Sequence, residues 1–513
     1  MKRVMSVVMA VILTISLLPL SAAGEDFTGM TATEIVDLMG VGWNLGNTFD
    51  ATGGTREDIY SQEQSWGNPI VDASLIQRVK EAGFKSIRIP VTWYRHTDSD
   101  YTINPAFLAR VREVIDYCYA QDLIVIINMH HEEWLNHKDL ANDQVKIGEQ
   151  LAAMWRQIAD YFADYDQRLI FEAMNEPRMK DTRVEWTGNK DGFDAVNYLN
   201  QVFVDTIRTN PKGNNAERCL MVPGYAASSS RQAMSAITFP TVNGEVVNNL
   251  IISVHGYVPY DFCLSDNWAD FDPTNKSHTS GIDSMYSNMQ KLFIDKGIPV
   301  VLGETGATNT KNNLEARERW AYYIGAKAAA YGIPTLIWDN GNNQSSGGEC
   351  HAWVRRKLHE KLRSQKTPYI IPTVIEQLMA GANSVAWGSG REMPVMPKSM
   401  LNGTVMWADA SGVKIGTNRK ITFPSRLEWF AQGRQYAVAY TGTSPVHLVL
   451  MLSDQTEVML TAKMTNPLGV KTIAWFPYDD VMQALAGHTS EEIVSIRAEA
   501  NNVTIYEISY VGK

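Results

Sequence analysis

Two glutamates in the sequence each follow a short apolar run, at a point where a buried strand is expected to end. Glu176 follows the run 168–171, and Pro177 comes directly after it. Proline lacks an N–H and fixes its own φ, so the strand must stop there. Glu304 follows a second apolar run, 299–302. Two opposed carboxyl groups suit a reaction that needs a proton donor and a nucleophile, such as retaining glycoside hydrolysis, in which they lie about 5 Å apart.

Other polar and aromatic side chains follow apolar runs in the same way. A hydrophobic core does not favour most of these residue types, and the C-terminal ends of parallel barrel strands converge on one mouth. Asn175 directly precedes Glu176. We therefore expect these side chains to gather on one face of the fold. The remaining members of the set are Arg88, His130, His131, Glu132, His255, Tyr257, Trp338 and Asp339.

Short apolar runs alternate with helical patterns from about residue 40 to residue 379, and this alternation predicts the elements that place the set. Strand-like runs interleaved with helices favour a (β/α)8 barrel, or TIM barrel, of the α/β class. An open doubly wound sheet is the competing fold, but no glycine-rich dinucleotide fingerprint follows the first run. The predicted strands are 40–46, 86–90, 123–129, 168–171, 220–222, 250–254, 299–302 and 334–338.

The sequence changes character after residue 381. Helical periodicity fades, and short β-rich runs separated by turn residues predict an antiparallel β-sandwich. Glycine, serine and proline residues between 388 and 397 indicate a linker. We therefore divide the chain into a catalytic barrel at 24–383, a linker at 384–396 and a sandwich at 397–513. The β-rich runs are 404–407, 437–440, 446–451, 457–460, 471–476, 493–496 and 502–508.

Residues 1–23 have the pattern of a secretory signal peptide. Lys2 and Arg3 form a positive start, an apolar stretch follows, and residues 21–23 are small enough for cleavage. A retained membrane anchor is the alternative, although no later segment is long and apolar enough to span a bilayer. The mature protein is therefore expected to be secreted and free of the membrane.

Composition and charge narrow the range of partners. The formal net charge of −10 argues against a nucleic-acid partner, because phosphate binding needs a basic surface. The chain has 14 Trp and 21 Tyr, whose flat faces suit contacts with sugar rings. The cysteines Cys118, Cys219, Cys263 and Cys350 lack the spacing of a zinc site. Cys263 with Cys350 is the one disulfide pair that we consider.

Seven motifs, taken together and in order, resemble glycoside hydrolase family 5, in particular the endoglucanases of its subfamily 4. The resemblance covers roughly residues 40–341 and leaves out the sandwich. One departure is Gly256, because Ala or Phe is usual after the strand-end histidine, and this glycine is expected to loosen the local packing. The motifs are GWNLGNTFD (42–50), IRIPVTW (87–93), NMHHE (128–132), MNEPR (174–178), VHGY (254–257) with PYDF (259–262), GE (303–304) and WDNG (338–341).

The resemblance implies roles for the residues around the two carboxyl groups. Glu176 would be the acid/base and Glu304 the nucleophile. Asn175 would hydrogen-bond the 2-OH of the sugar in the −1 subsite. Arg88 and Tyr257 would steer the Glu304 carboxylate and keep it ionised, while apolar burial is expected to raise the pKa of the acid.

The resemblance also implies residues that bind the sugar. His130 and His255 would hold hydroxyls of the −1 sugar and the acid/base network, and Trp338 would be the floor of that subsite. Asn47 and His131 are further candidate substrate contacts. Neither a cofactor nor a metal is expected, because adjacent histidines on a strand point to opposite faces and no third ligand for them is apparent.

Four further tryptophans divide into two groups. Trp134 and Trp268 follow strand ends and are candidates for the floors of outer subsites. Trp43 and Trp93 are expected to be structural.

The sequence therefore predicts a cofactor-free endo-β-1,4-glucanase that acts on cellulose-like β-glucan by double displacement. Specificity for xyloglucan, mixed-linkage glucan or mannan on the same machinery is the close alternative. A non-catalytic glycan-binding protein with the same fold is the alternative from another class.

The predicted sandwich resembles a carbohydrate-binding module of no assigned family. Trp387, Trp407, Trp429 and Trp475 are its candidate ligand platforms. Each by itself is expected in the sandwich core, with one or two of the four exposed. An inert spacer or an immunoglobulin-like packing domain is the alternative.

Overall fold

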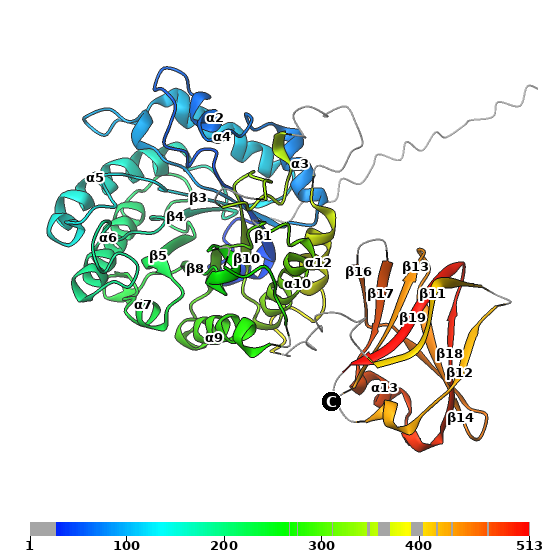
Figure 1. Cartoon of the computed structure of the whole chain (residues 1–513). Coiled ribbons are helices and arrows are strands. Elements are labelled where there is room, and N and C mark those ends of the chain that lie inside the picture. The colour runs from blue at the N-terminus through cyan, green and yellow to red at the C-terminus, as the bar shows by residue number, and fades with distance from the viewer. Residues whose placement is uncertain are drawn as a thin grey trace, which may run out of the picture.

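The computed structural model describes residues 27–511 except 266, 274, 310, 346–348, 358–369, 391–403, 417–418, 432–433 and 469–470. The predicted signal peptide lies outside the described residues, as does the predicted linker after Gly390. None of the described helices is both long and apolar enough to cross a membrane. The chain forms a closed barrel and, C-terminal to it, two antiparallel sheets (Figure 1).

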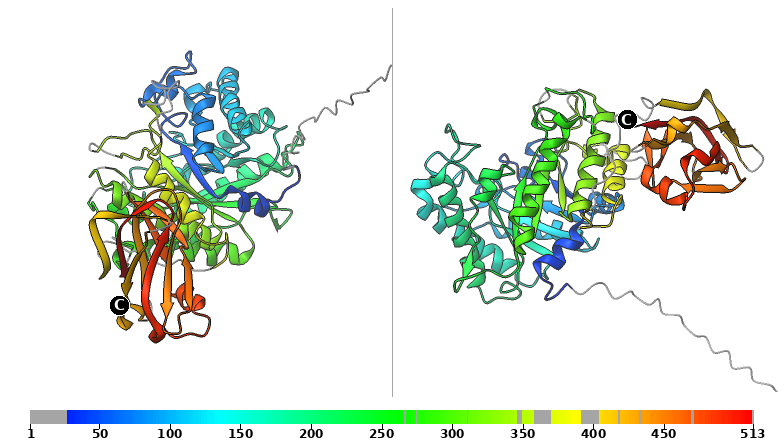
Figure 2. Two further views of the ribbon diagram at one scale, coloured as in Figure 1. Left: turned by 90° about the vertical axis from the view of Figure 1, so that its right-hand side faces the viewer. Right: turned by 90° about the horizontal axis from the view of Figure 1, so that it is seen from below.

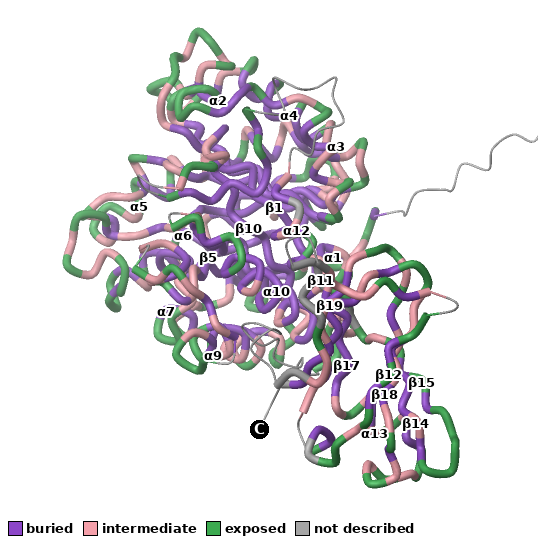
Figure 3. The backbone as a smooth tube through the Cα atoms, turned by 45° about the vertical axis from the view of Figure 1, so that its right-hand side comes forward, coloured by how far each residue is buried: buried purple, intermediate pink, exposed green. Residues whose placement is uncertain are grey.

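Eight parallel strands close the predicted barrel in the order β1-β10-β9-β8-β5-β4-β3-β2. All residues of these strands are buried except the last residue of β5 (Figure 3). They are buried because helices cover the outside of the barrel and side chains fill its inside. The strands are β1 (Val41–Leu45), β2 (Ser86–Ile89), β3 (Ile124–Asn128), β4 (Leu169–Glu172), β5 (Leu220–Ser228), β8 (Leu250–His255), β9 (Val300–Thr305) and β10 (Thr335–Asp339).

Amphipathic helices cover the outside of the barrel (Figure 2). Asp72, Asn104 and Asn189 each accept a backbone N–H from the first turn of the following helix, which fixes where three of the helices begin. The helices are α2 (Ser61–Ser65), α3 (Ala73–Glu81), α4 (Pro105–Tyr119), α5 (Leu140–Tyr161), α6 (Lys190–Arg208), α7 (Arg231–Ser235), α8 (Tyr260–Cys263), α9 (Lys276–Leu292), α10 (Leu314–Tyr331) and α12 (Pro372–Ala382); a hairpin, β6 (Thr241–Val242) with β7 (Glu245–Val246), follows α7.

Helix α1 (Ala32–Met39) closes the N-terminal end of the barrel. Thr31 and Glu34 form a capping box at its start. Ile35 and Met39 pack in one buried cluster with strand side chains such as Ile126. Since this end is filled, the open mouth lies at the C-terminal ends of the strands, where barrels of this kind carry their sites.

The C-terminal sheets confirm the predicted antiparallel β structure and have a hydrophobic core of their own. Their orders are β11-β19-β13-β17-β16 and β12-β18-β14-β15. The prediction missed β12 and β16; both lie at sheet edges and contain proline, which cannot donate to a central ladder and breaks the β pattern. The elements are β11 (Thr404–Ile415), β12 (Ile421–Pro424), β13 (Gln435–Thr441), β14 (Val446–Leu452), β15 (Glu457–Thr461), β16 (Met464–Leu468), β17 (Lys471–Phe476), α13 (Tyr478–Ala484), β18 (Ile493–Ala500) and β19 (Val503–Val511).

The four candidate platform tryptophans are less exposed than predicted. Trp429 and Trp475 are 6% and 1% exposed, so their faces are closed to a ligand. Trp387 is half-buried and packs on the core of the barrel, whereas Trp407, also half-buried, packs on the core of the sandwich. The expectation that one or two of them are exposed is wrong.

All four cysteines are buried, and each is a thiol and not half of a disulfide. The N–H of Thr308 donates to the carbonyl of Cys263, and its hydroxyl accepts the N–H of Cys350. Thr308 therefore lies between the two residues of the pair that we considered.

Candidate active site

A cavity of about 860 Å³ opens at the C-terminal ends of the barrel strands. Its wall combines carboxyl, imidazole, amide and aromatic groups, as the sequence predicted for this face. Arg88 lies beneath it, fully buried. The predicted residues that line the cavity are Asn47, His130, His131, Asn175, Glu176, His255, Tyr257, Glu304 and Trp338.

Arg88 connects three groups of the site from β2. Its Nη1 donates to Oε1 of Glu304 over 2.6 Å, its Nη2 to Oδ1 of Asn175 over 2.8 Å, and its Nε to Oε2 of Glu172 over 2.7 Å. Burial alone would lower the pKa of Arg88, but the charges of Glu172 and Glu304 outweigh burial and raise the pKa. The guanidinium thus stays charged and fixes both the predicted nucleophile and the predicted 2-OH contact.

Glu172 is a buried carboxylate that the sequence analysis did not select. It ends β4, three residues before Asn175, and is fully buried. Besides Arg88, it accepts from the hydroxyl of Ser253 over 2.6 Å and from Nδ2 of Asn128 over 3.0 Å. The sequence signal that could have identified Glu172 is its position at the end of an apolar run. Its partners make it a counter-ion that holds Arg88 in place.

The second oxygen of Glu304 has its own donor. The hydroxyl of Tyr257 donates to Oε2 over 3.1 Å. Burial, together with the charge of Glu304, raises the pKa of Tyr257 well above its ordinary value, so the phenol stays protonated. Both carboxylate oxygens of Glu304 are therefore held by hydrogen-bond donors, which fixes the orientation of the predicted nucleophile.

Glu176 pairs with a histidine at the end of β8. Nδ1 of His255 lies 2.9 Å from Oε1 of Glu176, and Nη1 of Arg178 lies 3.6 Å from Oε2. Burial raises the pKa of Glu176, but the hydrogen bond and charge of His255 outweigh it and the pKa is lowered. The prediction that burial decides this pKa is wrong. The pKa of His255 is raised, because Glu304 and Glu176 outweigh its burial.

The spacing of the two glutamates distinguishes between the two outcomes of glycoside hydrolysis. One carboxylate oxygen of Glu176, one of Glu304 and one ring nitrogen of His255 all lie within 4.8 Å of one another. Retaining glycosidases place their carboxyl groups about 5 Å apart, whereas inverting enzymes need about 6.5–9.5 Å for a water molecule. The separation fits a retaining pair.

His130 and Trp338 form an adjoining wall of the cavity. Their rings are nearly parallel, 4° between planes and 5.7 Å between centroids. Asn128 donates to Nδ1 of His130 over 3.2 Å, so a neutral His130 carries its proton on Nε2. The imidazole can donate a hydrogen bond, and the indole of Trp338 offers a flat face to a sugar ring.

Two predicted outer-subsite residues do not line this cavity. The indole N–H of Trp134 donates to Oε2 of Glu132 over 2.6 Å, and Trp268 lies against His278 with ring centroids 4.8 Å apart. The lining instead includes Trp66 and Trp186, 41% and 59% exposed. Trp66 follows α2 and Trp186 precedes α6, and no local pattern in the sequence distinguished them from the other loop tryptophans.

Among the described residues, two clusters bring three possible metal ligands within 4.8 Å of one another. One consists of Glu176, Glu304 and His255. The other consists of His130, His131 and Asp50, so the prediction that the histidines lack a third ligand is wrong.

The prediction that His130 and His131 point to opposite faces is also wrong. Strand β3 ends at Asn128, so strand alternation no longer applies to the histidines, and their ring centroids lie 4.4 Å apart. Both oxygens of Asp50 accept backbone N–H groups, from Asn47 over 2.9 Å and Thr48 over 2.7 Å. With both carboxylate oxygens of Asp50 already bonded, this cluster suits hydrogen bonding to a substrate better than metal binding.

Gly256 does not loosen the packing, contrary to the sequence prediction. A Cβ added there would lie 2.3 Å from Sδ of Met285 in α9. The space of the missing side chain is thus filled by Met285, and the glycine permits a close approach of the helix to the end of β8.

Comparison with known proteins agrees with this geometry. Residues 48–344 match the protein family Cellulase (glycosyl hydrolase family 5). Endoglucanase B of Ruminococcus albus is 41% identical over 331 residues, which are 63% of this chain and 77% of that protein. A GH5-4 broad specificity endoglucanase from Ruminococcus flavefaciens is 42% identical, with a TM-score of 0.63 over 69% of this chain and 99% of that one.

A third relative was solved with a sugar bound. XEG5A, a GH5 xyloglucan-specific endo-β-1,4-glucanase from a metagenomic library, in complex with cellotriose, is 35% identical, with a TM-score of 0.61 over 68% of this chain and 98% of that one. The chain therefore belongs to glycoside hydrolase family 5, a family of retaining hydrolases.

Proposed function

We propose that the protein is an exported endo-β-1,4-glucanase that cleaves internal bonds of β-glucan with retention of the β anomer. The observation that carries this proposal is the spacing of Glu176 and Glu304, whose oxygens lie within 4.8 Å. The groups around the two glutamates indicate a different role for each. Arg88 and Tyr257 donate to Glu304, whereas Glu176 shares a hydrogen bond with the titratable His255.

In the first step, the Glu304 carboxylate attacks the anomeric carbon of the −1 sugar. Glu176 gives its proton to the glycosidic oxygen, the C1–O bond breaks, and a glycosyl–enzyme ester forms on Glu304. In the free enzyme this proton is shared with Nδ1 of His255, 2.9 Å from Oε1. Transfer along that hydrogen bond supplies the neutral acid that the step requires.

In the second step, water replaces the leaving sugar. Glu176, now a carboxylate, takes a proton from the water, and the resulting oxygen attacks C1 and releases Glu304. Arg88 then again neutralises part of the charge that returns to Glu304. The two inversions at C1 give net retention.

The proposed sugar contacts surround this pair. Asn175 accepts from Arg88 through Oδ1, which leaves its NH2 group for the 2-OH of the −1 sugar. His130 and Trp338 supply a donor and a stacking face beside it. Trp66 and Trp186 are exposed at the wall of the cavity, and we assign them to outer subsites because exposed indoles suit sugar stacking.

The cleft also has room for a substituted glucan such as xyloglucan. A second cavity of about 560 Å³ shares Trp66 and His131 with the first and extends to Lys138 and Lys180. One related structure is that of a xyloglucan-specific enzyme. Initial rates of hydrolysis would be compared for cellulose, xyloglucan, barley glucan and mannan. The polymer that is hydrolysed fastest is the preferred substrate.

The assignment of the nucleophile is tested by chemical rescue. Glu304→Gly should abolish hydrolysis, and azide should restore cleavage of an activated aryl β-cellobioside by occupying the vacated space. Failure of azide to restore cleavage, in a variant that unfolds like the wild type, would contradict the role of Glu304. NMR of early products should show the β anomer first, and an α anomer would overturn the retaining mechanism.

Export and glycan binding by the sandwich are part of the proposal. The pattern of residues 1–23 supports export. The separate core of the sandwich supports an independent module, and Trp407 is the half-buried candidate for its ligand platform. Detection of the mature protein in the culture medium, starting near residue 24, would test export.

A further inference from the structure

Side-chain hydrogen bonds hold the described residues around His351, in the segment that follows β10. The N–H of His351 donates to Oδ1 of Asn340 over 3.1 Å. The carbonyl of Glu349 accepts from Nδ2 of Asn340 over 3.1 Å and from Nδ2 of Asn342 over 2.9 Å. The backbone at His351 therefore has little freedom, and its ring is directed by the loop.

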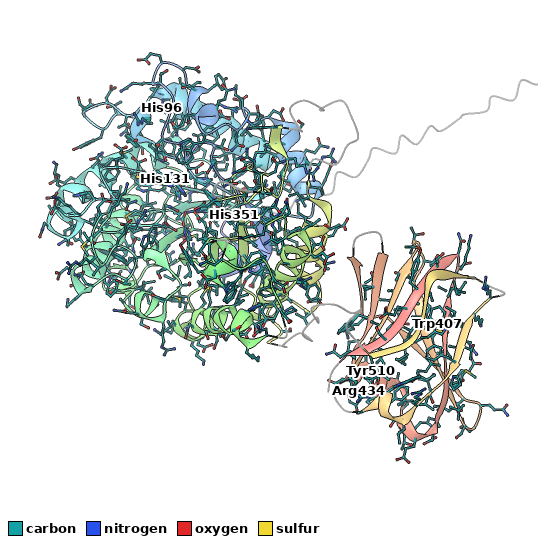
Figure 4. The ribbon with its side chains drawn as sticks, in the orientation of Figure 1. His96, His131, His351, Trp407, Arg434 and Tyr510 are labelled. Atoms are coloured by element: carbon teal, nitrogen blue, oxygen red, sulfur yellow. The ribbon has the colours of Figure 1, made fainter. Side chains whose placement is uncertain are left out.

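The ring of His351 is fully buried in the barrel (Figure 4). Neither of its nitrogens has a hydrogen-bond partner among the described residues. Burial, together with the nearby charge of Arg317, lowers the pKa of His351 to about 3, so the ring is neutral at any pH near neutrality. Buried polar atoms without partners reduce stability, so an aromatic hydrocarbon would serve a purely structural purpose better.

The neighbours of the ring connect it to the nucleophile. The rings of His351 and Tyr257 meet edge to face, with centroids 5.7 Å apart and planes at 64°. Tyr257 donates to Glu304 over 3.1 Å. A Cβ added to Gly306 would lie 2.8 Å from Nδ1 of His351 and 3.5 Å from the ring of Tyr257. The imidazole of His351 thus contacts the ring of Tyr257, and the chain two residues after Glu304 approaches both rings.

We propose that His351 is a positioning residue: its imidazole sets the angle of the Tyr257 ring and thereby aims the phenol hydroxyl at Oε2 of Glu304. The inference rests on the retaining glucanase reaction proposed above and adds a residue to it.

A double-mutant cycle on an aryl β-cellobioside and on carboxymethylcellulose tests this role. His351→Ala should lower kcat on the order of tenfold, because a misplaced catalytic contact slows the reaction, with KM within about twofold. Gly306→Ala should act similarly, because its Cβ would lie 2.8 Å from Nδ1 of His351 and displace the imidazole. The Gly306→Ala variant remains informative if His351→Ala fails to fold. Tyr257→Phe removes the hydroxyl through which both act.

The cycle separates positioning from packing. If His351 acts through Tyr257, neither His351→Ala nor Gly306→Ala lowers kcat further in the Tyr257→Phe background. Full additivity of the losses, or an unchanged kcat in both single variants, would overturn the inference while leaving the wild-type glucanase activity in place. A wild-type enzyme that cleaves neither substrate would overturn the proposed function itself.

Discussion

At the scale of single residues, the site depends on how one buried cation is neutralised. Arg88 and Glu172 are both fully buried, and Glu304 is 5% exposed. Charges in such surroundings are stable only when they are paired and hydrogen-bonded. Arg88 meets this condition with donors to Glu172, Glu304 and Asn175. Arg88, which hydrogen-bonds the proposed nucleophile, is therefore also a structural ion.

Arg88→Gln should therefore damage both stability and activity. Glu172 would remain as a buried charge without its cation, and the free energy of unfolding should fall by about 3–5 kcal/mol. Denaturant unfolding and hydrolysis of carboxymethylcellulose measure the two effects. Arg56→Gln is the matched control, because its pair with Asp98 is solvent-exposed and should be worth less than about 1 kcal/mol. Equal losses in the two variants would contradict the account of Arg88.

The pair of Glu176 and His255 should set the alkaline limb of activity. The raised pKa of His255 means that the pair keeps a proton above the ordinary imidazole value of 6.5 and loses it as pH rises further. kcat/KM should fall with that loss, because the acid has no proton to give. In His255→Gln, Glu176 must hold the proton alone, so the alkaline limb should move to lower pH.

The control for this pH experiment is His488→Gln, whose histidine lies in the sandwich and pairs with Glu492. Its kcat/KM profile should coincide with that of the wild type. A limb that stays in place in His255→Gln would show that another group carries the proton.

At the scale of elements, the site is built where strands end and helices approach closely. Met285 of α9 lies in the space that a side chain at position 256 would take, directly after β8. The N–H of Gly256 donates to the carbonyl of Glu304, so the same glycine joins the ends of β8 and β9. Residues of helices far from the substrate thus determine how the strand ends lie.

Gly256→Ala should destabilise the barrel by overpacking. The added methyl would meet Met285, and the expected cost is about 1–3 kcal/mol. Met285→Ala makes room, so the loss in the double variant should be smaller than the sum of the single losses. Gly416→Ala is the control, because its Cβ would meet only a backbone nitrogen 3.8 Å away. Calorimetric unfolding measures all four, and simple additivity would contradict the contact.

At the scale of the whole molecule, the barrel and the sandwich have separate hydrophobic cores. The proposed catalytic residues all come from the barrel, and β16 of the sandwich approaches α12 on the outside of the barrel (Figure 1). A module with its own core can fold and act without its neighbour. The sandwich is therefore expected to affect where the enzyme binds and not the chemistry.

Deletion of residues 397–513 should spare activity on soluble carboxymethylcellulose and weaken binding to insoluble cellulose. Pull-down with insoluble cellulose measures the second effect, and Trp407→Ala in the full chain tests the proposed platform. Equal binding by the full and truncated chains would favour a spacer over a carbohydrate-binding module. Loss of activity on the soluble substrate would contradict the independence of the barrel.

Local patterns in the sequence were sufficient for the barrel, the sandwich and the two glutamates. Apolar runs and helical periodicity are properties of neighbouring residues. The prediction that Pro177 stops the strand is wrong, because β4 already ends at Glu172. Barrel geometry then brings strand ends together, which is why Glu176, Glu304 and Arg88 could be selected together. The edge strands β12 and β16 escaped prediction because their prolines interrupt the pattern.

Features that depend on which distant residues meet were decided only by the tertiary structure. Glu172 is the counter-ion of Arg88. The interaction with His255 outweighs the effect of burial on the pKa of Glu176. Trp66 and Trp186 line the cleft, whereas the predicted Trp134 and Trp268 do not. Sequence spacing fixes the local conformation and the face of an element. It does not fix which partner fills a gap or balances a charge, because those energies depend on contacts between residues far apart in the chain.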